Sequence, residues 1–592
     1  MSKPDDEVLG KAYDSRLVAR LWEVTRPHQR LVLLSLVLFP LTAAVELLGP
    51  YLVKVAIDQH ILVGDWSGLG GMALLFLLTL IALYLLRVGQ AYVTQLTGQR
   101  VMHDLRRALF AHIQRLDAAF FDRNPVGRLM TRVLSDVEAI NEMFTSGAVA
   151  IVGDVVTLTG VVVVLLLLNW KLALVTFALV PVLVIAAAYF RLRAREVYRL
   201  VRARLAVLNA FLQESLQGMT VIQLFARERQ EAASFARLNG DLRAAQFRST
   251  VYDASLYATV EVIGSAAVAL LLWYGSGEVL ANALTFGGLV AFIEYTSRFF
   301  LPIRDLGAKY SVMQAAMVSA ERVFGLLDTA PAFTGGRRAA GPPAAADAAV
   351  EFRGVSFAYP GGDWVLRDCS FHIGARERVA LVGPTGEGKT TIARLMMRAY
   401  EAAEGQVLVG GIDVREWDLQ ALRRYVGLIP QEPFLFAGTV RENLALGDDG
   451  AVADADLHRA LARAQAARLV DDLPGGLAAV VRERGVNLSQ GQRQLLAIAR
   501  ALIYNPRVLA LDEATSSVDA ESEALIRAAM VELLEDRASL IIAHRLSTIQ
   551  SADRILVLHK GRMREAGRHA ELVAAGGLYA RLYEMQFGRE PA

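Results

Sequence analysis

The sequence predicts a membrane-embedded all-α helical bundle fused to a separate α/β domain, and three observations support this fold class. The chain has 592 residues, of which 54% are hydrophobic, and the apolar residues are concentrated before about residue 325. Six runs in this part are long enough to cross a bilayer, which takes roughly 20 mostly apolar residues per helix. After residue 350, strand-like and helix-like segments alternate, as they do in α/β folds.

The apolar half of the chain contains six candidate membrane spans, separated by polar connections. The block of valines and leucines at 161–168 is the clearest span, and the short break at 169–171 predicts a tight hairpin between the third and fourth spans. The candidate spans cover residues 31–56, 71–97, 145–168, 171–190, 255–281 and 286–308. We expect these six helices to form one bundle.

The charge on the connections predicts an orientation. Long polar segments rich in arginine follow the second and fourth spans, and the stretch from Arg191 to Arg204 is the richest. The connections on the other side, 57–70, 169–171 and 278–285, carry almost no basic residues. The positive-inside rule then puts the arginine-rich segments and both termini in the cytoplasm. The alternative, nucleic-acid binding or a solvated surface, fits their regular alternation with membrane spans less well.

Composition excludes some classes of function. A formal net charge of +2 favours neither a nucleic-acid-binding protein nor an enzyme of acidic substrates. The single cysteine, Cys369, rules out an intrachain disulfide. The polar N-terminal segment, with Asp5, Asp6 and Glu7, lacks the basic start and short apolar core of a secretory signal. We therefore expect the first apolar run, from Leu31, to be retained as a membrane anchor.

Domain boundaries follow from the same patterns. Residues 331–349 are rich in Gly, Pro, Ala and Arg, which predicts a linker. An alternating strand pattern begins at Val350. The predicted parts are a cytoplasmic N-terminal segment with an elbow helix at 1–30, a six-helix membrane domain at 31–325, a linker at 326–349 and the α/β domain at 350–592.

A phosphate-binding loop occupies the start of the α/β domain. Residues 383–390 fit G-x-x-x-x-G-K-[ST], a β-run at 377–382 precedes them, and a helix pattern follows. Glycines let backbone N–H groups approach phosphates, and the helix N-terminus adds partial positive charge. Lys389 would reach the β- and γ-phosphates, and Thr390 would ligate Mg²⁺. A chance match is the alternative, which the strand–loop–helix context disfavours. The nucleotide-binding candidates here are Gly383, Pro384, Thr385, Gly386, Glu387, Gly388, Lys389, Thr390 and Thr391.

Two adjacent carboxylates end a later strand. Asp512 closes the apolar run 508–511, so its carboxylate would lie beside the phosphate loop and hold Mg²⁺, directly or through water. Glu513 follows and points to the other side, where it would orient and polarise the attacking water. A solvated acidic pair after a strand is the alternative interpretation.

The order of these motifs resembles that of ATP-binding-cassette (ABC) proteins. Between the phosphate loop and Asp512 lies Leu488-Ser489-Gln490-Gly491-Gln492, which resembles the family signature. The resemblance covers nearly the whole chain and is to type IV exporters of drugs, lipids and peptides. It implies a dimer with twelve membrane helices and two ATP sites, each closed by the signature of the other subunit. ATP binding would switch the cavity from inward- to outward-facing, and hydrolysis would reset it.

Further residues match the family pattern one by one. Tyr359 resembles the aromatic that stacks on adenine, although a packed strand tyrosine is the ordinary alternative. Gln431 resembles the glutamine that senses Mg²⁺ and takes part in catalysis, and His544 resembles the switch histidine that contacts the γ-phosphate. Ser489, Gln490, Gly491 and Gln492 would contact the partner's nucleotide. The resemblance also assigns an exporter-specific loop to 483–485, a further interface loop to 516–519, and cytoplasmic coupling helices to 120–128 and 220–226.

Gln490 departs from the family pattern, which has glycine at that position. A side chain there changes the sterics and hydrogen bonding of the site formed with the partner's phosphate loop. An altered signature beside an intact Glu513 resembles the catalytic half of heterodimeric exporters. We therefore expect a heterodimer, and a homodimer that tolerates Gln490 is the alternative.

Charged residues within membrane spans are costly and usually functional. Those in or near the candidate spans are Glu46, Arg87, Asp154, Glu261, Glu294 and Arg298. Glu46, Asp154 and Glu261 are expected to face an internal acidic cavity that favours cationic amphiphiles, or else to make hydrogen bonds between helices. Glu294 and Arg298 lie four residues apart and could pair with each other. Drugs, lipids and peptides all remain open as substrates.

The resulting hypothesis is ATP-driven export of hydrophobic or amphipathic substrates across the cytoplasmic (inner) membrane. It uses ATP and Mg²⁺, a second half-transporter and membrane lipid as partners, and no nucleic acid. The alternatives are a homodimeric lipid or drug flippase and an ATP-gated channel or regulator on the same scaffold. A soluble ABC ATPase that acts on nucleic acid is disfavoured by the six spans.

Overall fold

The computed structural model describes residues 14–332, 348–446, 452–512, 520–543 and 546–587. These residues form two compact units. The first unit contains Val126–Thr329 and the chain before Arg115, and the second contains Arg115–Pro125 and the chain from Ala330. Each unit is described by itself below.

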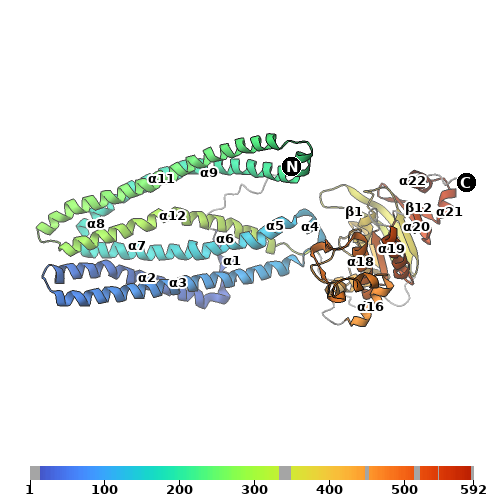
Figure 1. The fold of residues 1–592 in the computed structure, drawn as a ribbon, viewed down its shortest axis with the longest axis horizontal. Coiled ribbons are helices and arrows are strands. Elements are labelled where there is room, and N and C mark those ends of the chain that lie inside the picture. The colour runs from blue at the N-terminus through green and yellow to red at the C-terminus, as the bar shows by residue number, and fades with distance from the viewer. Residues whose placement is uncertain (1–13, 333–347, 447–451, 513–519, 544–545, 588–592) are drawn as a thin grey trace. The chain divides into compact units, whose positions relative to one another are not determined.

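The first unit is built from long helices, shown in blue to green in Figure 1. Helix α2 packs against α3, α7 and α12, and α9 runs along α11. Its core includes Leu172 of α8, Leu271 of α11 and Phe292 of α12, none of which is exposed. The helices are α1 (Ser15–Thr25), α2 (Gln29–Val55), α3 (Trp66–Ile113), α5 (Val126–Thr131), α6 (Val137–Glu142), α7 (Val149–Leu168), α8 (Trp170–Phe177), α9 (Val180–Gln217), α10 (Met219–Leu224), α11 (Glu228–Leu280) and α12 (Phe286–Leu327).

Five helical stretches of the described chain are long and apolar enough to cross a membrane: Ser15–Ile61, Trp66–Ile113, Ile151–Leu168, Trp170–Gln217 and Glu228–Leu280. They contain the predicted spans 31–56, 71–97 and 171–190, and they overlap most of 145–168 and 255–281. The sixth, 286–308, lies in α12 but is not among these stretches, so a bundle of six spans stays a prediction. The hairpin at 169–171 is capped by Asn169, whose side-chain oxygen accepts hydrogen bonds from the N–H groups of Lys171 and Leu172.

Short helices occur at both segments that resemble coupling helices. Helix α10 occupies most of the second segment. In the first, α4 (Ala118–Arg123) packs with the second unit, because Ala119 is buried in the core that includes Trp417 and Leu422. Asp122 also accepts a hydrogen bond from the hydroxyl group of Tyr400.

The second unit contains a mostly parallel six-stranded sheet, in the order β12-β11-β3-β10-β9-β6, in which only the edge strand β12 is antiparallel to its neighbour. Strands β3 and β9 are apolar and buried, as expected for strands covered on both faces. A second sheet, in the order β2-β1-β4-β5, is antiparallel. The strands of the larger sheet are β3 (Arg378–Val382), β6 (Val426–Ile429), β9 (Val508–Asp512), β10 (Ala538–Ile542), β11 (Arg554–His559) and β12 (Arg562–Gly567).

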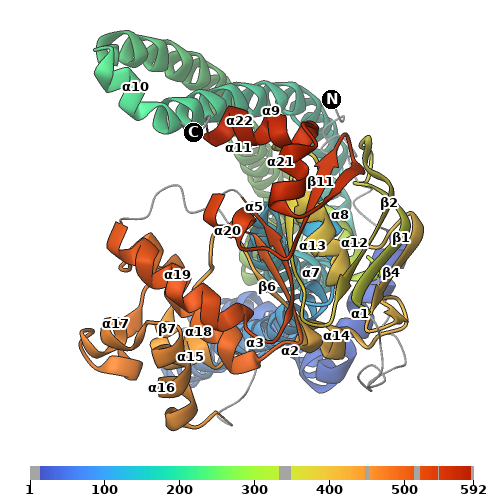
Figure 2. The ribbon, with the colours of Figure 1, turned by 90° about the vertical axis from the view of Figure 1, so that its right-hand side faces the viewer.

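Helices and smaller strands complete the second unit (Figure 2). The remaining strands are β1 (Ala348–Ala358), β2 (Trp364–Gly374), β4 (Glu404–Val409), β5 (Ile412–Asp413), β7 (Gly438–Thr439) and β8 (Val480–Val481). The helices are α13 (Lys389–Met396), α14 (Leu419–Tyr425), α15 (Val440–Leu444), α16 (Asp454–Arg463), α17 (Ala467–Asp471), α18 (Gln490–Tyr504), α19 (Ala520–Leu534), α20 (Leu546–Gln550), α21 (His569–Ala574) and α22 (Leu578–Phe587).

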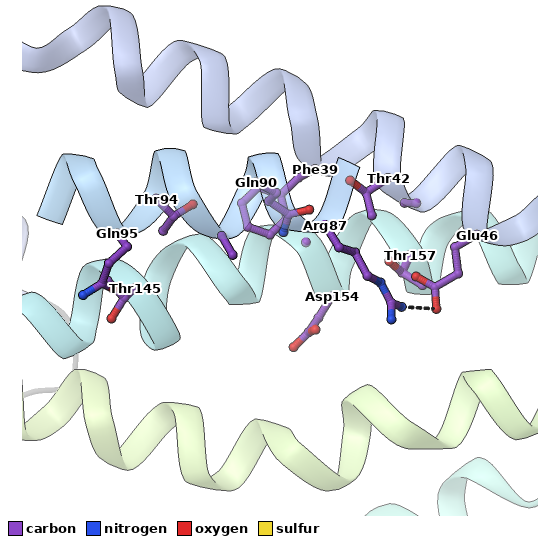
Figure 3. A pocket seen from close by; sticks show the side chains of 13 residues that line it. Phe39, Thr42, Glu46, Arg87, Gln90, Thr94, Gln95, Thr145, Asp154 and Thr157 are labelled. Atoms are coloured by element: carbon purple, nitrogen blue, oxygen red, sulfur yellow. Dashed lines mark ion pairs between the residues drawn. The ribbon is translucent and has the colours of Figure 1, made fainter. Parts of the chain in front are cut away.

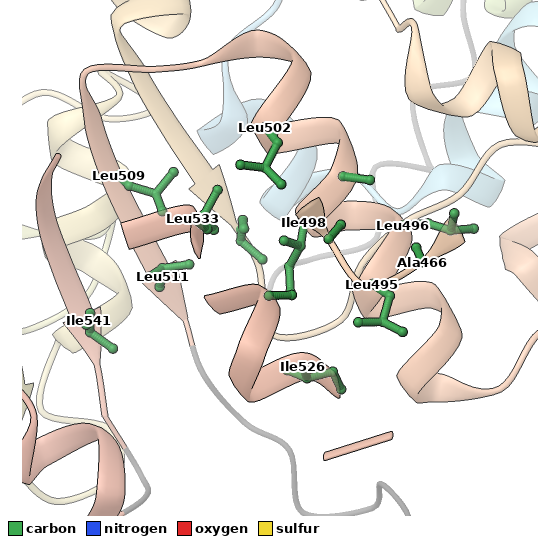
Figure 4. Packing of buried hydrophobic residues seen from close by; sticks show 14 of the residues in the cluster. Ala466, Leu495, Leu496, Ile498, Leu502, Leu509, Leu511, Ile526, Leu533 and Ile541 are labelled. Carbon is green, nitrogen blue, oxygen red and sulfur yellow. The ribbon is translucent and has the colours of Figure 1, made fainter. Parts of the chain in front are cut away.

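The register of the parallel sheet brings the functional motifs to one edge. Asp512 pairs with Ile542, Ile542 with Leu381, and Leu511 with Ile429. The carboxyl ends of β3, β9, β10 and β6 are therefore level, and ligands of open α/β sheets bind at this edge. Apolar side chains of α18 and α19, including Ile498 and Leu533, pack in one cluster with Leu509 of β9 and Ile541 of β10 (Figure 4).

Candidate functional site

The loop between β3 and α13 has a backbone that requires glycine. Gly386 and Gly388 have φ of +88° and +99°, in the left-handed region that other residues rarely adopt. A Cβ atom at Gly383 would lie 2.3 Å from the carbonyl oxygen of Leu558. The loop therefore lies close against β11 and leads directly into the N-terminus of α13, as the sequence predicts.

Lys389 folds its side chain back into this loop. Its Nζ donates hydrogen bonds to the carbonyl oxygens of Gly383 at 2.6 Å and Pro384 at 2.8 Å. Burial lowers the pKa of the Lys389 ammonium group, and the nearby charges of Asp512 and Glu387 act in the opposite direction. The cation is thus held where the loop would surround phosphate oxygens.

Glu387 directs its side chain away from the lysine's hydrogen-bond partners. Its Oε2 accepts a hydrogen bond of 3.3 Å from the N–H of Gly561, and its Oε1 lies 3.3 Å from Nδ1 of His559. His559 is the last residue of β11, and Gly561 lies in the turn between β11 and β12. The Glu387 carboxylate therefore connects the loop to the end of β11 and the turn that follows it.

Thr390 and Asp512 meet at the carboxyl edge of the sheet. Thr390 Oγ1 donates a hydrogen bond of 2.9 Å to Asp512 Oδ2. Hydroxyl and carboxylate oxygens are the ligands that Mg²⁺ prefers, usually with one or two carboxylates and the remainder from phosphate and water. The hydroxyl oxygen of Thr390 and the carboxylate of Asp512 fit this type of donor set. No group of three His, Cys, Asp or Glu side chains that could hold a metal occurs among the described residues.

A cavity of about 550 Å³ opens beside these residues. It brings together Tyr359, Thr390, Gln431 and Asp512, four candidates that are far apart in the sequence. The volume is in the usual range for small-molecule sites, roughly 300–1,000 Å³. The lining residues are Tyr359, Thr390, Ala393, Arg394, Leu428, Pro430, Gln431, Glu432 and Asp512.

Tyr359 contacts the loop side of this cavity. Its hydroxyl group and Thr391 Oγ1 are 2.9 Å apart, and its ring packs edge-on against Phe357 and Tyr400. Arg394, which the sequence analysis did not select, donates to the Tyr359 hydroxyl at 3.4 Å. Its position one helical turn after Thr390 was the available signal, because residues four apart share a helix face.

The Ser489–Gln492 segment begins α18. Ser489 is the N-cap, since its hydroxyl accepts a hydrogen bond from the N–H of Gln492. The side-chain oxygen of Gln492 in turn accepts a hydrogen bond from the N–H of Ser489. Gln490 is the first helical residue. None of the four residues 489–492 lines the cavity described above. Glu513, His544 and the 516–519 loop lie outside the described residues, directly after β9 or soon after β10.

A second cavity, of about 490 Å³, lies within the helical unit (Figure 3). Glu46 of α2 and Asp154 of α7 line it, as expected, but so does Arg87 of α3. Glu46 and Arg87 form an ion pair at 3.1 Å. The full lining consists of Phe39, Thr42, Ala43, Glu46, Arg87, Gln90, Ala91, Thr94, Gln95, Thr145, Gly153, Asp154 and Thr157.

The expectation of an acidic cavity is therefore wrong, because both carboxylates are paired with cations. Arg298 also approaches Glu46, at 3.8 Å between charged atoms, and donates a hydrogen bond of 2.7 Å to the Glu46 carbonyl oxygen. Asp154 forms an ion pair with Lys309. Arg298 thus contacts α2 as well as lying one turn from Glu294, and Glu261 is exposed and not part of the lining.

Two family models match the chain. Residues 32–303 match the ABC transporter transmembrane region, and residues 366–516 match the ABC transporter model. The ATP-dependent lipid A-core flippase of Thiobacillus denitrificans is 35% identical over 579 residues, which covers 97% of this chain and 99% of that protein. The chain belongs to the ABC transporter family.

Two further comparisons locate this ABC transporter among the exporters. The probable multidrug resistance ABC transporter ATP-binding/permease protein YheH of Bacillus subtilis is 38% identical over 507 residues, 85% of this chain and 74% of that protein. The solved structure of a bacterial Atm1-family ABC exporter with ATP bound matches with a TM-score of 0.77 and 30% identity, covering 95% of this chain and 99% of that chain.

The sequence-based interpretation is thereby confirmed at the level of the family. The ABC transporter is a multi-pass membrane protein that joins a helical transmembrane domain to an α/β nucleotide-binding domain. It is a half-transporter of the exporter class, its nucleotide-binding domain binds ATP and acts as the transport ATPase, and exporters of this class function as dimers.

Proposed function

We propose that this chain is the hydrolytic half of a heterodimeric exporter that moves hydrophobic or amphipathic substrates out across the cytoplasmic membrane. The observation that carries the proposal is the meeting of Thr390 and Asp512, 2.9 Å apart, at the cavity that Tyr359 and Gln431 also line. Together with the Lys389 loop, this arrangement would place an aromatic ring for the adenine base, hydrogen-bond donors for the phosphates and oxygen ligands for a metal at one site.

Each residue at this edge of the sheet has a role in the proposed ATP site. Tyr359 would stack on adenine, and the 383–391 loop with Lys389 would bind the phosphates through N–H and ammonium donors. Thr390, Asp512 and Gln431 would hold Mg²⁺, which when bound neutralises charge on the phosphate oxygens. Glu513 would orient the attacking water and accept its proton, and His544 would donate to the γ-phosphate.

The proposal that the partner is a different chain rests on Gln490. It begins α18 directly after the N-cap Ser489, so its side chain is added where the family has none. Helix N-termini bind anions through exposed N–H groups, and a side chain at the first helical position changes access to them. The site formed by this chain's signature and the partner's loop would still bind ATP but hydrolyse it poorly, and the site with Lys389, Asp512 and Glu513 would remain competent.

Copurification tests this assignment directly. A tagged version of the chain, expressed in its native host, should bring down a second half-transporter that lacks the catalytic glutamate and has the standard signature. A stable homodimer of this chain alone, with full ATPase and transport activity, would contradict the proposal and favour the homodimeric flippase.

The proposed substrates are amphipathic molecules, and the inner cavity supports this class better than a purely cationic one. Glu46, Arg87 and Asp154 place both signs of charge beside apolar Phe39 and several threonines and glutamines. Reconstituted exporter should move fluorescent amphiphiles against a gradient when ATP is present. Flux that only dissipates a gradient would favour the channel alternative.

We further infer that the nucleotide-binding domain and both termini are cytoplasmic, which labelling of engineered cysteines in intact cells would test.

A further inference from the structure

An arginine within α18 joins two segments of the nucleotide-binding domain that are distant in sequence. Arg500 Nε donates a hydrogen bond of 2.8 Å to the carbonyl oxygen of Asn443, and Nη1 donates to the carbonyl oxygen of Phe434 at 3.2 Å. Nη2 lies 3.4 Å from Asn443 Oδ1. Burial lowers the pKa of this guanidinium, and the three acceptors are uncharged oxygens. Burying a cation against neutral acceptors is costly, so the contact is expected where the carbonyls that it satisfies must be held in place.

Asn443 is the second member of this connection, and it is 1% exposed. Its Nδ2 donates to the carbonyl oxygens of Phe436 at 2.8 Å and Thr439 at 3.1 Å, and its Oδ1 accepts from the N–H of Phe436 at 2.8 Å. Residues 430–437 have no helical or strand hydrogen bonding of their own. The path of this segment therefore depends on the side chains that satisfy its backbone, and Asn443 and Arg500 are chief among them.

The same segment is also tied to the chain just before the signature. Strand β7 pairs with β8 through Gly438–Val481 and Thr439–Val480. Arg493, on the first turns of α18, donates to the carbonyl oxygen of Gly485 at 3.4 Å. The 434–443 segment, the 480–485 segment and α18 thus form one hydrogen-bonded framework.

The two ends of this framework belong to different ATP sites in the dimer. Gln431, three residues before Phe434, lines the cavity of this chain's own nucleotide. Gln490 begins α18 directly after the N-cap Ser489 and lies ten residues before Arg500, or about 15 Å along the helix at 1.5 Å per residue. Under the proposed function, Ser489 and Gln490 face the partner's nucleotide. A rigid helix with a forked hydrogen-bond donor is suited to carry a displacement between these ends.

We propose that Arg500 and Asn443 are positioning residues that couple this chain's two half-sites, so that closure of the signature on the partner's ATP sets Gln431 at this chain's own ATP. The inference rests on the proposed function in assigning the signature to the partner's site. A planar guanidinium with three directed N–H donors fixes both carbonyls at once, which a lysine ammonium on a flexible stem does not.

Kinetics of the exporter with its copurifying partner test the proposal. Arg500→Lys should lower kcat for ATP about tenfold, while Kd for a fluorescent ATP analogue stays within about twofold, because the Lys389 loop is untouched. Asn443→Ala should lower kcat to a similar extent, and kcat of the double variant should be no lower than that of the worse single variant. Arg463→Lys is the control, since Arg463 contacts Glu532 at an exposed site at 2.7 Å, and it should behave as wild type. Multiplicative losses in the double variant, or a fall in affinity equal to the fall in kcat, would overturn the proposal.

Amide hydrogen exchange tests the coupling without the Arg500 and Asn443 variants, and so applies even if these variants fold poorly. In a complex that carries Lys389→Ala in this chain, a non-hydrolysable ATP analogue loads only the partner's loop. Exchange at 488–492 should then slow through direct contact, and exchange at 434–443 should slow with it by about tenfold. Slowing at 488–492 without slowing at 434–443 overturns the coupling. No slowing at 488–492 instead contradicts the shared ATP site, and with it the proposed function.

Discussion

Thr390 donates a hydrogen bond of 2.9 Å to Asp512 across the carboxyl edge of the parallel sheet, 122 positions away in the sequence. The pair has oxygen atoms suited to one Mg²⁺ ion. Asp512→Asn should therefore reduce Mg²⁺-dependent ATPase activity by about 10²–10³-fold, because a preorganised charge is lost at the site of phosphoryl transfer. Binding of ATP in EDTA should be retained. Asp536→Asn, which removes one partner of an exposed ion pair with Arg376, is the control and should leave turnover unchanged.

Gly383 has no room for a side chain. Its Cβ would lie 2.3 Å from the Leu558 carbonyl oxygen, so Gly383→Ala should displace the loop at a cost of about 1–3 kcal/mol and abolish measurable ATP binding. Gly476→Ala is a matched control, because its φ is +57° but nothing lies within 4 Å. The control should lower stability by about 1–2 kcal/mol and leave nucleotide binding intact. Equal effects of the two substitutions on ATP binding would contradict this explanation.

The contact between Tyr400 and Asp122 fastens α4 to the nucleotide-binding domain. Tyr400→Phe removes the hydroxyl donor and keeps the ring packing against Phe357. The substitution should raise the ATP consumed per substrate transported about two- to fivefold, because a hydrogen bond to a charged group contributes about 1.5–3 kcal/mol, part of which water replaces. Basal ATPase activity without substrate should change little. A proportional loss of both activities would indicate a site defect instead.

Cys369 is fully buried, and its thiol donates to the Gly561 carbonyl oxygen at 3.0 Å. Burial raises the pKa of the Cys369 thiol, so both exposure and thiolate fraction are low near pH 8. Because it is the only cysteine, a maleimide dye should label the native protein at least about 100-fold more slowly than the denatured one. Saturating ATP should slow labelling further by mass action. Rapid stoichiometric labelling of the native protein would contradict the buried placement.

Glu46 in the inner cavity should not act as a selectivity residue for cations, since Arg87 and Arg298 already neutralise it. Glu46→Gln removes the carboxylate that pairs with Arg87 and approaches Arg298, so it should lower thermal stability. Glu46→Gln with Arg87→Gln should recover part of that loss. Transport of cationic dyes should not fall selectively. Glu261→Gln, at an exposed position outside the cavity, is the matched control. A selective loss of cationic dye transport in Glu46→Gln alone would restore the acidic-cavity hypothesis.

Sequence patterns predicted the parts of this site that lie in contiguous motifs or at strand ends. The 383–390 loop was found from its motif, and Asp512 from its place at the end of an apolar strand, since the ends of parallel strands meet at one edge of the sheet. Pairings between distant helices left no comparable signal. Arg87 with Glu46, Lys309 with Asp154, and Arg500 with Asn443 depend on how side chains pack in three dimensions, and a single sequence does not contain that information.

Glu387 shows the same limit within a motif. The spacing of the loop assigns it a place at the phosphates, but the direction of its side chain is set by the β11–β12 turn, where it meets Gly561 and His559. The expectation of an acidic cavity was wrong for a related reason. The pattern shows which carboxylates lie in spans, but not which cations the neighbouring helices bring to them.

The reciprocal hydrogen bonds between Ser489 and Gln492 mean that the first turn of α18 is already formed in one subunit on its own. A helix start that lacked these bonds would have to become ordered during association, at about 1–2 kcal/mol per residue. Here the surface offered to a second subunit's nucleotide is assembled in advance. The rate at which two nucleotide-binding domains meet is then governed by diffusion and orientation of finished surfaces, and not by the folding of the contact itself.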